Sequence, residues 1–383
     1  MDKTQYLKNV AATVAHFEQL TLEELLIDQK QVNNFSMASL ALSHFIRSIK
    51  VSDHGSVIKD ILTFQHITML GQQYPIIVKD AILDDNVLTK LQELKSNPHV
   101  IATFHFGSYR QINSLLLEHD VPFALVISSA TISEQSREFL KKSQEYFNKS
   151  FTLIDAESPS CLISMIKEIK KGKSLVIYLD GNIGAGGNKA KQDSLCSIDF
   201  LNGNLHVRKG AAYISHIAKV PILTASCFLE NYKDLYFDFG KSITPGEHEE
   251  RENYALSTMQ ELYSHFTHVL EKYPQQWEAW FYLHKNIDNK KLPGFNHDHT
   301  GNNYGEQVYD PSKLLRFNLK HYSLFKGTSE YYVLDKRTFL SYPLREDAYT
   351  LLLNCLAKEN FKINASNKIL AGHLIEKNLL IMN

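Results

Sequence analysis

Hydrophobic residues recur with a helical spacing near the start of the chain. Tyr6, Val10, Val14 and Phe17 follow one another at steps of four and three, the spacing of one face of an α-helix. A second set of apolar residues suggests another amphipathic helix: Leu40, Phe45, Ile46 and Ile49. We therefore expect residues 1–95 to form an N-terminal helical region that packs on the domain that follows.

The pattern changes to short apolar runs from about residue 98. These runs are typical of buried strands, and they occupy residues 99–104, 122–128, 150–156, 174–180 and 220–226. Helix-like segments lie between them, at 133–147, 158–171 and 208–219. Alternation of strands and helices predicts an α/β domain over residues 96–285, with a mostly parallel sheet flanked by helices.

A polar stretch then separates this domain from the end of the chain. Residues 286–312 are rich in Asn, Gly and Pro and show neither a helix nor a strand period, so we interpret them as an interdomain linker. Beyond it, residues 330–342 alternate like a short hairpin, and two helical patterns follow at 348–356 and 369–374. We expect residues 313–383 to form a small winged-helix-like α+β domain.

Composition narrows the class of protein and of partner. A chain of 383 residues, 44% hydrophobic and 22% charged, has ordinary globular values and is long enough for more than one domain. Its formal net charge of −1 argues against broad attraction to nucleic acid or anionic lipid. The four cysteines show no paired metal-ligand spacing, and we interpret them as buried thiols. The first turns carry charges rather than a signal or membrane segment, and a cytoplasmic location is the default expectation, with at most peripheral membrane contact.

The candidate chemistry lies at the ends of the predicted strands. His105 stands directly after the apolar run VIATF, and ligands of α/β sheets bind at the carboxyl ends of strands. Neutral imidazole accepts a proton from an attacking hydroxyl or amine, which makes His105 a candidate general base. Gly107 and Ser108 follow it, and backbone amides there would suit a developing oxyanion or a phosphate. The plainer interpretation is a hydrogen-bonded structural histidine.

Asp180 ends another apolar run, SLVIYLD, so its side chain should emerge on the same rim of the sheet as His105. A carboxylate there would orient the imidazole and stabilise its protonated form. The alternative is a turn-forming Asp before Gly. The glycines that follow, at 181, 184, 186 and 187, do not reproduce the dinucleotide fingerprint, and Lys189 and Lys191 suit either a phosphate or a solvated loop.

Over residues 50–285 the chain resembles the lysophospholipid acyltransferase superfamily, and in particular its branch of late acyltransferases of lipid A biosynthesis. The segment HFGSYR (105–110) resembles that branch's His-Phe-Gly-Asn-Trp-Glu block, and KGKSLVIYLDGN (171–182) resembles its strand ending in Asp. IDFLNGNLHVRKGAAYISHIAKVPIL (198–223) is similar to its Phe-Phe-Gly block, and YPQQWEAWFYLHK (273–285) to its closing Pro-x-x-Trp segment.

The resemblance implies transfer of a fatty acyl group from a thioester on acyl carrier protein or coenzyme A to a hydroxyl or amine, with His105 as base. It also implies no metal and no bound cofactor. Phe200, Gly203 and Arg208 become a candidate wall for the acceptor or donor. One departure is Arg110, which stands where the family has an Asp or Glu and offers no hydrogen-bond acceptor. Either Asp180 replaces that carboxylate, or Arg110 binds a substrate phosphate or carboxylate, or activity has been lost.

Two C-terminal segments carry a second resemblance: YYVLDKRTFLSYPLREDAYTLLLNCL (331–356) and ILAGHLIEKNLLI (369–381). They resemble the small peptide-binding winged-helix domains of ribosomal-peptide modification enzymes, which implies a peptide substrate that adds a strand to the hairpin. Packing or dimerisation is the alternative, and no clustered basic stripe indicates nucleic acid. The sequence thus predicts an acyltransferase with a non-membrane acceptor, either a peptide or a small metabolite. Two alternatives remain: acylation of a lysolipid at the membrane surface, and a catalytically silent protein that binds an acyl carrier or a peptide.

Overall fold

The computed structural model describes residues 3–25, 29–181, 194–286, 313–326, 331–335, 340–357, 361–362 and 367–382. The chain divides into two compact units. One unit comprises Met1–Gln19 and Phe45–Asn286, and the other comprises Leu20–His44 and Ile287–Asn383. Residues 20–44 thus group with the C-terminal unit, whereas the sequence pattern placed all of 1–95 with the α/β domain.

A six-stranded sheet forms the centre of the first unit, in the order β3-β2-β4-β1-β7-β8. Its strands are β1 (Val100–Thr103), β2 (Phe123–Ile127), β3 (Thr152–Asp155), β4 (Ser174–Tyr178), β7 (Ile222–Glu230) and β8 (Asp234–Phe239). All are parallel to their neighbours except β8, which pairs antiparallel with β7 at one edge. The predicted mostly parallel sheet is confirmed. The strands β1 to β4 and β7 correspond to the apolar runs of the sequence.

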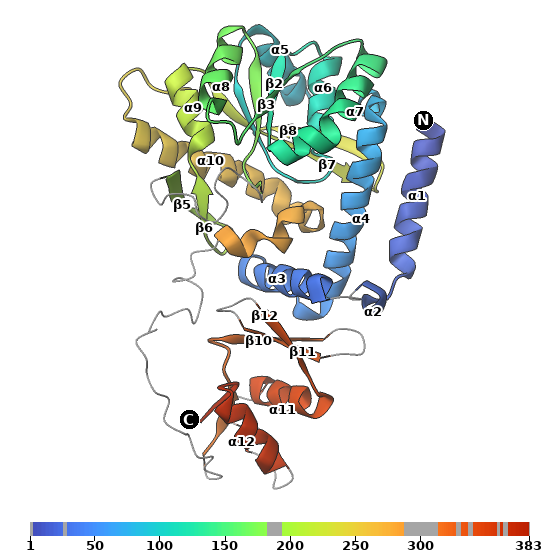
Figure 1. The fold of residues 1–383 in the computed structure, drawn as a ribbon, viewed down its shortest axis with the longest axis vertical. Helices are drawn as coiled ribbons and strands as arrows, with labels where there is room; N and C mark the ends of the chain where they lie inside the picture. Colours follow the sequence, from blue (N-terminus) through green and yellow to red (C-terminus); the bar gives the residue numbers. More distant parts are fainter. Residues whose placement is uncertain are drawn as a thin grey trace. The chain divides into compact units, whose positions relative to one another are not determined.

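Helices cover both faces of this sheet (Figure 1). On one side α8 (Cys161–Lys170), α9 (Gly210–Ala218) and α10 (Arg251–Lys272) pack on the strands and on one another in that order. On the other side lie α5 (Asp85–Ser96), α6 (Gln111–Glu118) and α7 (Ser129–Phe147). An antiparallel hairpin of β5 (Leu195–Phe200) and β6 (Gly203–Arg208) precedes α9 and was not predicted.

The N-terminal helix α1 (Lys3–Gln19) lies beside α4 (His54–Gln73), as Figure 1 shows. The predicted apolar face of α1 is confirmed, because Tyr6, Val10 and Phe17 are buried and Val14 is partly buried in the same core. Tyr6 also stacks on Tyr74, with the ring centroids 5.4 Å apart. Burial of such a helix face is what stabilises it, since helices of this length are marginal alone.

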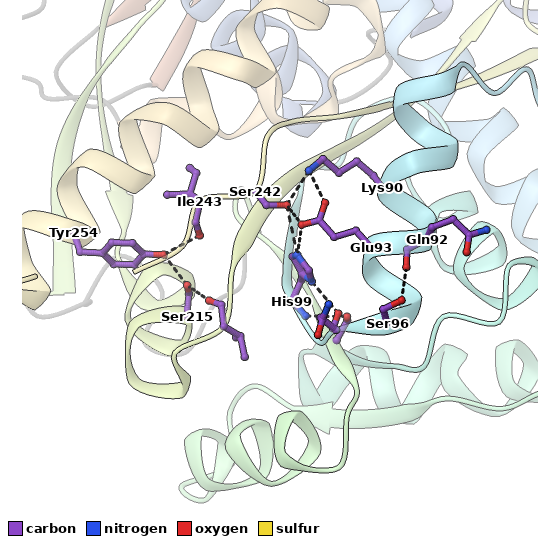
Figure 2. A network of polar contacts seen from close by, with 12 residues as sticks. Lys90, Gln92, Glu93, Ser96, His99, Ser215, Ser242, Ile243 and Tyr254 are labelled. Atoms are coloured by element: carbon purple, nitrogen blue, oxygen red, sulfur yellow. Dashed lines mark hydrogen bonds and ion pairs between the residues drawn. The ribbon is translucent and has the colours of Figure 1, made fainter. Parts of the chain in front are cut away.

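A polar network joins α5 to the beginning of β1 and to the segment after β8 (Figure 2). Glu93 accepts hydrogen bonds from Lys90 at 2.6 Å and from Ser242 at 2.7 Å, and it contacts His99 Nε2 at 3.0 Å. The other ring nitrogen of His99 lies 2.9 Å from Asn97 O. His99 is buried, so these contacts satisfy a side chain that water does not reach.

The second unit contains two antiparallel sheets and several helices. The three-stranded sheet has the order β10-β11-β12, made of Tyr322–Lys326, Tyr331–Asp335 and Leu340–Leu344, and β13 (Leu380–Met382) pairs with β9 (Leu315–Phe317). The helices are α2 (Leu22–Leu25), α3 (Gln29–Phe45, whose last residue groups with the first unit), α11 (Glu346–Ala357) and α12 (Lys368–Glu376). The predicted small α+β module is confirmed, whereas the predicted linker lies outside the described residues except for Asn286.

Candidate active site

The register of two neighbouring strands places His105 beside Asp180. In the parallel pair β1 and β4, Thr103 is the partner of Tyr178, and the amide of Leu179 donates to Thr103 O at 2.8 Å. His105 and Asp180 each lie two residues beyond one member of this pair, so both reach the same rim of the sheet. The predicted proximity of these two side chains is confirmed.

Asp180 holds the imidazole of His105 in one tautomer. His105 Nδ1 lies 2.8 Å from Asp180 Oδ1, and the backbone N–H of His105 donates to Oδ2 at 2.9 Å. An ionised carboxylate only accepts hydrogen bonds, so Nδ1 carries the proton and Nε2 is left as the acceptor. The Asp180 side chain is 4% exposed and that of His105 is 21% exposed. The pair is therefore shielded, with the imidazole nearer to solvent.

Trp277 provides a further donor to the same carboxylate. Its indole Nε1–H donates to Asp180 Oδ2 at 2.7 Å, and the Trp277 side chain is fully buried. Around it the segment 276–278 runs beside 105–107: Phe106 forms an antiparallel bridge with Trp277, and the amide of Glu278 donates to His105 O at 3.2 Å. The closing segment thus fixes both members of the pair.

The surrounding charges make His105 more basic than an ordinary histidine. Burial alone lowers the pKa of His105, but the charge of Asp180 and its hydrogen bond raise it, and the charge of Glu278 adds to this effect. Arg110 opposes them by lowering the pKa. The net result is that the pKa of His105 is raised above its usual value, which favours the imidazolium form.

His105 lines a cavity of about 640 Å³. Several of the lining residues are apolar and come from β2, β3, β4, α7, α8 and α9: Leu125, Ile127, Phe139, Leu153, Met165, Ile177 and Ile214. Because β1, β4, β2 and β3 are successive neighbours, the lining extends over three strand spacings, or about 14 Å, from the end of β1 to β3. The cavity therefore has His105 on one side and an apolar wall that reaches the edge of the sheet.

Arg110 lies at the beginning of α6 and lines the same cavity. Its Nε donates to Tyr109 Oη at 3.3 Å, and its guanidinium lies 5.5 Å from the centre of the Tyr109 ring. Burial raises the pKa of Tyr109 to about 12, so this phenol stays neutral beside the cation. Arg208, at the end of β6, also lines the cavity, as do Lys285 and Glu278.

Gly107 and Ser108 do not form the expected oxyanion site. The Gly107 N–H donates to Gln276 O at 2.8 Å, so it is already used inside the protein. Gly107 has φ +55°, and a Cβ at this position would collide with the carbonyl of Cys227. Ser108 is buried, and neither residue is part of the cavity lining in the described chain. This glycine is needed for close backbone packing behind His105.

Phe200 and Gly203 lie in the β5–β6 hairpin and not along the described cavity lining. Phe200 is buried, with its ring centroid 5.6 Å from that of Trp277 and 5.9 Å from that of Tyr263. It therefore packs behind the site, whereas Arg208 of the same hairpin reaches the cavity. The glycines at 184, 186 and 187 and the lysines at 189 and 191 lie outside the described residues.

Three residues that the sequence interpretation assigned no role belong to this region. Nothing local in the sequence shows that the Trp277 indole meets an aspartate 97 positions away. Glu278 lines the cavity, and its pKa is raised by burial against the opposing effect of His105. Asn113 is buried in the lining, one helical turn after Arg110. Only its i+3 spacing from Arg110 would have indicated a shared face.

No protein-family model matches the chain, and a search of curated proteins finds no match. Within the described part of the chain, no group of three His, Cys, Asp or Glu side chains is placed to hold a metal ion. Among the described helices, none is both long and apolar enough to cross a membrane.

Proposed function

We propose that this protein is an acyltransferase that moves a fatty acyl group from a thioester to an amine or hydroxyl of a non-membrane acceptor. The observation that carries the proposal is that His105, which is held by Asp180, lies on the lining of a cavity that also has an apolar wall. An apolar cavity with few convergent polar groups is the usual form of a small-molecule site. The resemblance to lysophospholipid acyltransferases supports the same chemistry, with His105 in the same role.

In the proposed reaction, Nε2 of His105 takes a proton from the attacking amine or hydroxyl. The nucleophile forms a bond to the thioester carbonyl carbon, the carbon–sulfur bond breaks, and the imidazolium returns the proton to the sulfur. Asp180 holds Nδ1–H and stabilises the transient positive charge, as the carboxylate does in other His-based acyl transfer sites. The thiol leaves, and His105 is neutral again.

The two ends of the cavity suit the two ends of an acyl thioester. The apolar wall over β2, β3 and α8 would take the acyl chain, because burial of each methylene is worth about 0.8 kcal/mol. Arg208 and Lys285 are cations on the lining that suit the phosphates of acyl carrier protein's prosthetic group or of coenzyme A. The thioester carbonyl would then lie next to His105.

The decisive experiment follows thioester consumption and acyl transfer by mass spectrometry, with purified protein, acyl carrier protein and coenzyme A thioesters, and amine and hydroxyl acceptors. We expect His105→Ala to reduce transfer by about 100-fold or more, since general bases contribute that much. His268→Ala is the control, because His268 is exposed on α10 and its Nδ1 lies 2.7 Å from the backbone carbonyl of Ser264. If His105→Ala retains full transfer, the catalytic assignment is wrong.

We further propose that the second unit recruits a peptide partner by strand addition at β10. The sheet has β10 and β12 as its two edges, and β12 contains Pro343, which lacks an N–H and so interrupts any further ladder. Hydrogen exchange of the full chain with a library of extended peptides tests this idea. Protection of β10 amides supports it, and protection that falls on β12 instead contradicts it.

A further inference from the structure

We propose that the acyl acceptor is an α-amino acid, with its carboxylate on Arg110 and its amine between Glu278 and His105. This inference rests on the proposed function and names its acceptor. One cavity lining holds a cation (Arg110), an anion (Glu278) and a buried amide (Asn113) together with the candidate base, His105.

Arg110 supplies the cationic contact. A guanidinium presents five N–H donors in a planar fork whose geometry matches a carboxylate, and Nε of Arg110 donates to Tyr109 Oη. Bidentate pairing of this kind adds geometric specificity to the charge attraction. Tyr109 connects Arg110 to the base, because its ring centroid lies 4.8 Å from that of His105 and its Oη accepts from Arg110 Nε.

Asn113 adds a buried polar group to the same lining, beside Arg110 and Tyr178. Its side chain is 2% exposed, and its Oδ1 has no hydrogen-bond donor among the described residues. Its Nδ2 donates to Arg110 O at 3.4 Å, which directs the amide toward the cation's end of the helix. A buried carbonyl without a donor is unfavourable, and an N–H of a ligand would satisfy it.

Glu278 supplies the negative charge for the amine. It begins the short helix η6 (Glu278–Phe281), and its Oε2 accepts a hydrogen bond from Gln65 at 3.3 Å. Its own amide donates to His105 O, so the Glu278 backbone is fixed against the base. Burial raises the pKa of the Glu278 carboxyl, and a bound ammonium would reverse that effect.

The chemistry balances with the groups present. The ammonium of the amino acid gives one proton to Glu278 and thereby becomes a neutral nucleophile. Its nitrogen attacks the thioester carbon, His105 Nε2 takes a second proton, and that proton passes to sulfur as the carbon–sulfur bond breaks. Glu278 releases its proton to solvent. The products are an N-acyl amino acid and a free thiol.

Two experiments on the full chain test the inference. In the first, ligand-observed NMR measures binding of the standard amino acids, and the best one is compared with its own amino alcohol and hydroxy acid. We expect both analogues to bind at least about tenfold more weakly, since each leaves one buried group unpaired. Equal binding of either analogue, or no binding of any amino acid, contradicts the proposal whatever the turnover shows.

The second experiment measures acyl transfer to the same compounds. We expect Arg110→Gln and Glu278→Gln to raise the KM for the amino acid by about tenfold or more while the KM for the thioester is unchanged. Asn113→Leu should raise the same KM, and the exposed-site variants Arg47→Gln and Glu271→Gln should not. If His105-dependent thioester consumption occurs with hydroxyl or amine acceptors that lack a carboxylate, the amino acid is not the acceptor, but the proposed acyltransferase activity stands. Absence of any His105-dependent consumption would refute the acyltransferase itself.

Discussion

At the scale of single residues, the tautomer and basicity of His105 depend on Asp180. We expect Asp180→Asn to lower kcat by about 100-fold or more, because the amide cannot stabilise the imidazolium. The base must be neutral, so activity appears as pH rises through the pKa of His105, which Asp180 raises. Without that charge the pKa falls, and the acid limb of the pH–rate profile should move to lower pH. Asp199→Asn, at an exposed position of β5, is the control. If the acid limb of the pH–rate profile does not move in Asp180→Asn, Asp180 does not have the orienting role.

Trp277 is predicted to act on the reaction through Asp180. Trp277→Phe removes the donor to Asp180 Oδ2, whereas Trp280→Phe removes a donor to the backbone carbonyl of Pro274. Both indoles are fully buried, so each variant should lose about 1–3 kcal/mol of stability by chemical denaturation. Only Trp277→Phe should also displace the pH–rate profile. Identical profiles for the two variants would mean that Trp277 has a packing role alone.

His105 and Asp180 were predictable because both follow apolar runs, and neighbouring parallel strands bring their carboxyl ends together. The predicted oxyanion role of Gly107 was wrong, because its amide donates to Gln276 O, which is 169 positions away in the chain and pairs with Gly107 only after folding. Trp277 and Glu278 were missed for the same reason. Long-range backbone pairing decides these roles, and a single sequence carries no local pattern for it.

At the scale of elements, the polar network on α5 should make stability depend on pH. Burial raises the pKa of Glu93. Hydrogen bonds from Lys90, Ser242 and His99 outweigh this effect and lower the pKa from 4.5 to about 2. A carboxyl whose folded pKa is depressed contributes stability above its unfolded pKa and loses it as pH falls from about 4.5 toward 2. Because Glu93 is partly exposed, we expect Glu93→Gln to cost only about 1 kcal/mol at pH 7. Urea unfolding between pH 3 and 7 should show a flatter pH dependence in this variant than in Glu138→Gln, an exposed control.

The edge strand β3 is predicted to limit the length of the acyl chain. Leu153 lines the cavity from β3, the strand of the parallel sheet that is farthest from β1 on that side. Leu153→Phe should lower kcat/KM for long-chain donors relative to short ones by about tenfold or more, the usual effect of a few methylenes in an apolar pocket. Leu162→Phe, an exposed position on α8, should leave the ratio unchanged. An unchanged ratio in both variants would place the acyl chain elsewhere.

The parallel strands were predictable because burial on both faces produces continuous apolar runs. The antiparallel strand β8 and the β5–β6 hairpin were not predicted. In β8 the residues alternate between buried and partly exposed positions, and in β5 and β6 apolar and polar residues are mixed, so neither segment shows a continuous apolar run. The helix α1 was found because its buried residues share one face. The hydrophobic pattern of the sequence therefore identified the elements in which burial is regular along their whole length.

At the scale of the whole molecule, the path of the chain between the two units has a consequence for truncation. Residues 20–44 group with 287–383, while both flanking segments belong to the other unit. Within 20–44, α3 buries Phe35, Met37, Leu40 and Leu42. No sequence period distinguishes this helix from its N-terminal neighbours, which explains why the sequence placed it with the α/β domain. Its membership in the second unit is a property of the folded contacts.

A chain that ends at Asn286 should therefore be less stable than the full chain and more prone to self-association. Such a chain keeps the His105–Asp180 pair and the cavity but removes the rest of the unit to which α3 belongs. Newly exposed apolar surface on α3 should lower the thermal midpoint and promote self-association, because large apolar patches on soluble proteins favour association. Size-exclusion chromatography and thermal unfolding compare it with the full chain and with the same truncation carrying Phe35→Ser and Leu40→Ser. If the truncated chain is monomeric and unfolds at the same temperature as the full chain, α3 does not depend on residues 287–383. If the serine substitutions restore a monomer, the exposed face of α3 causes the self-association.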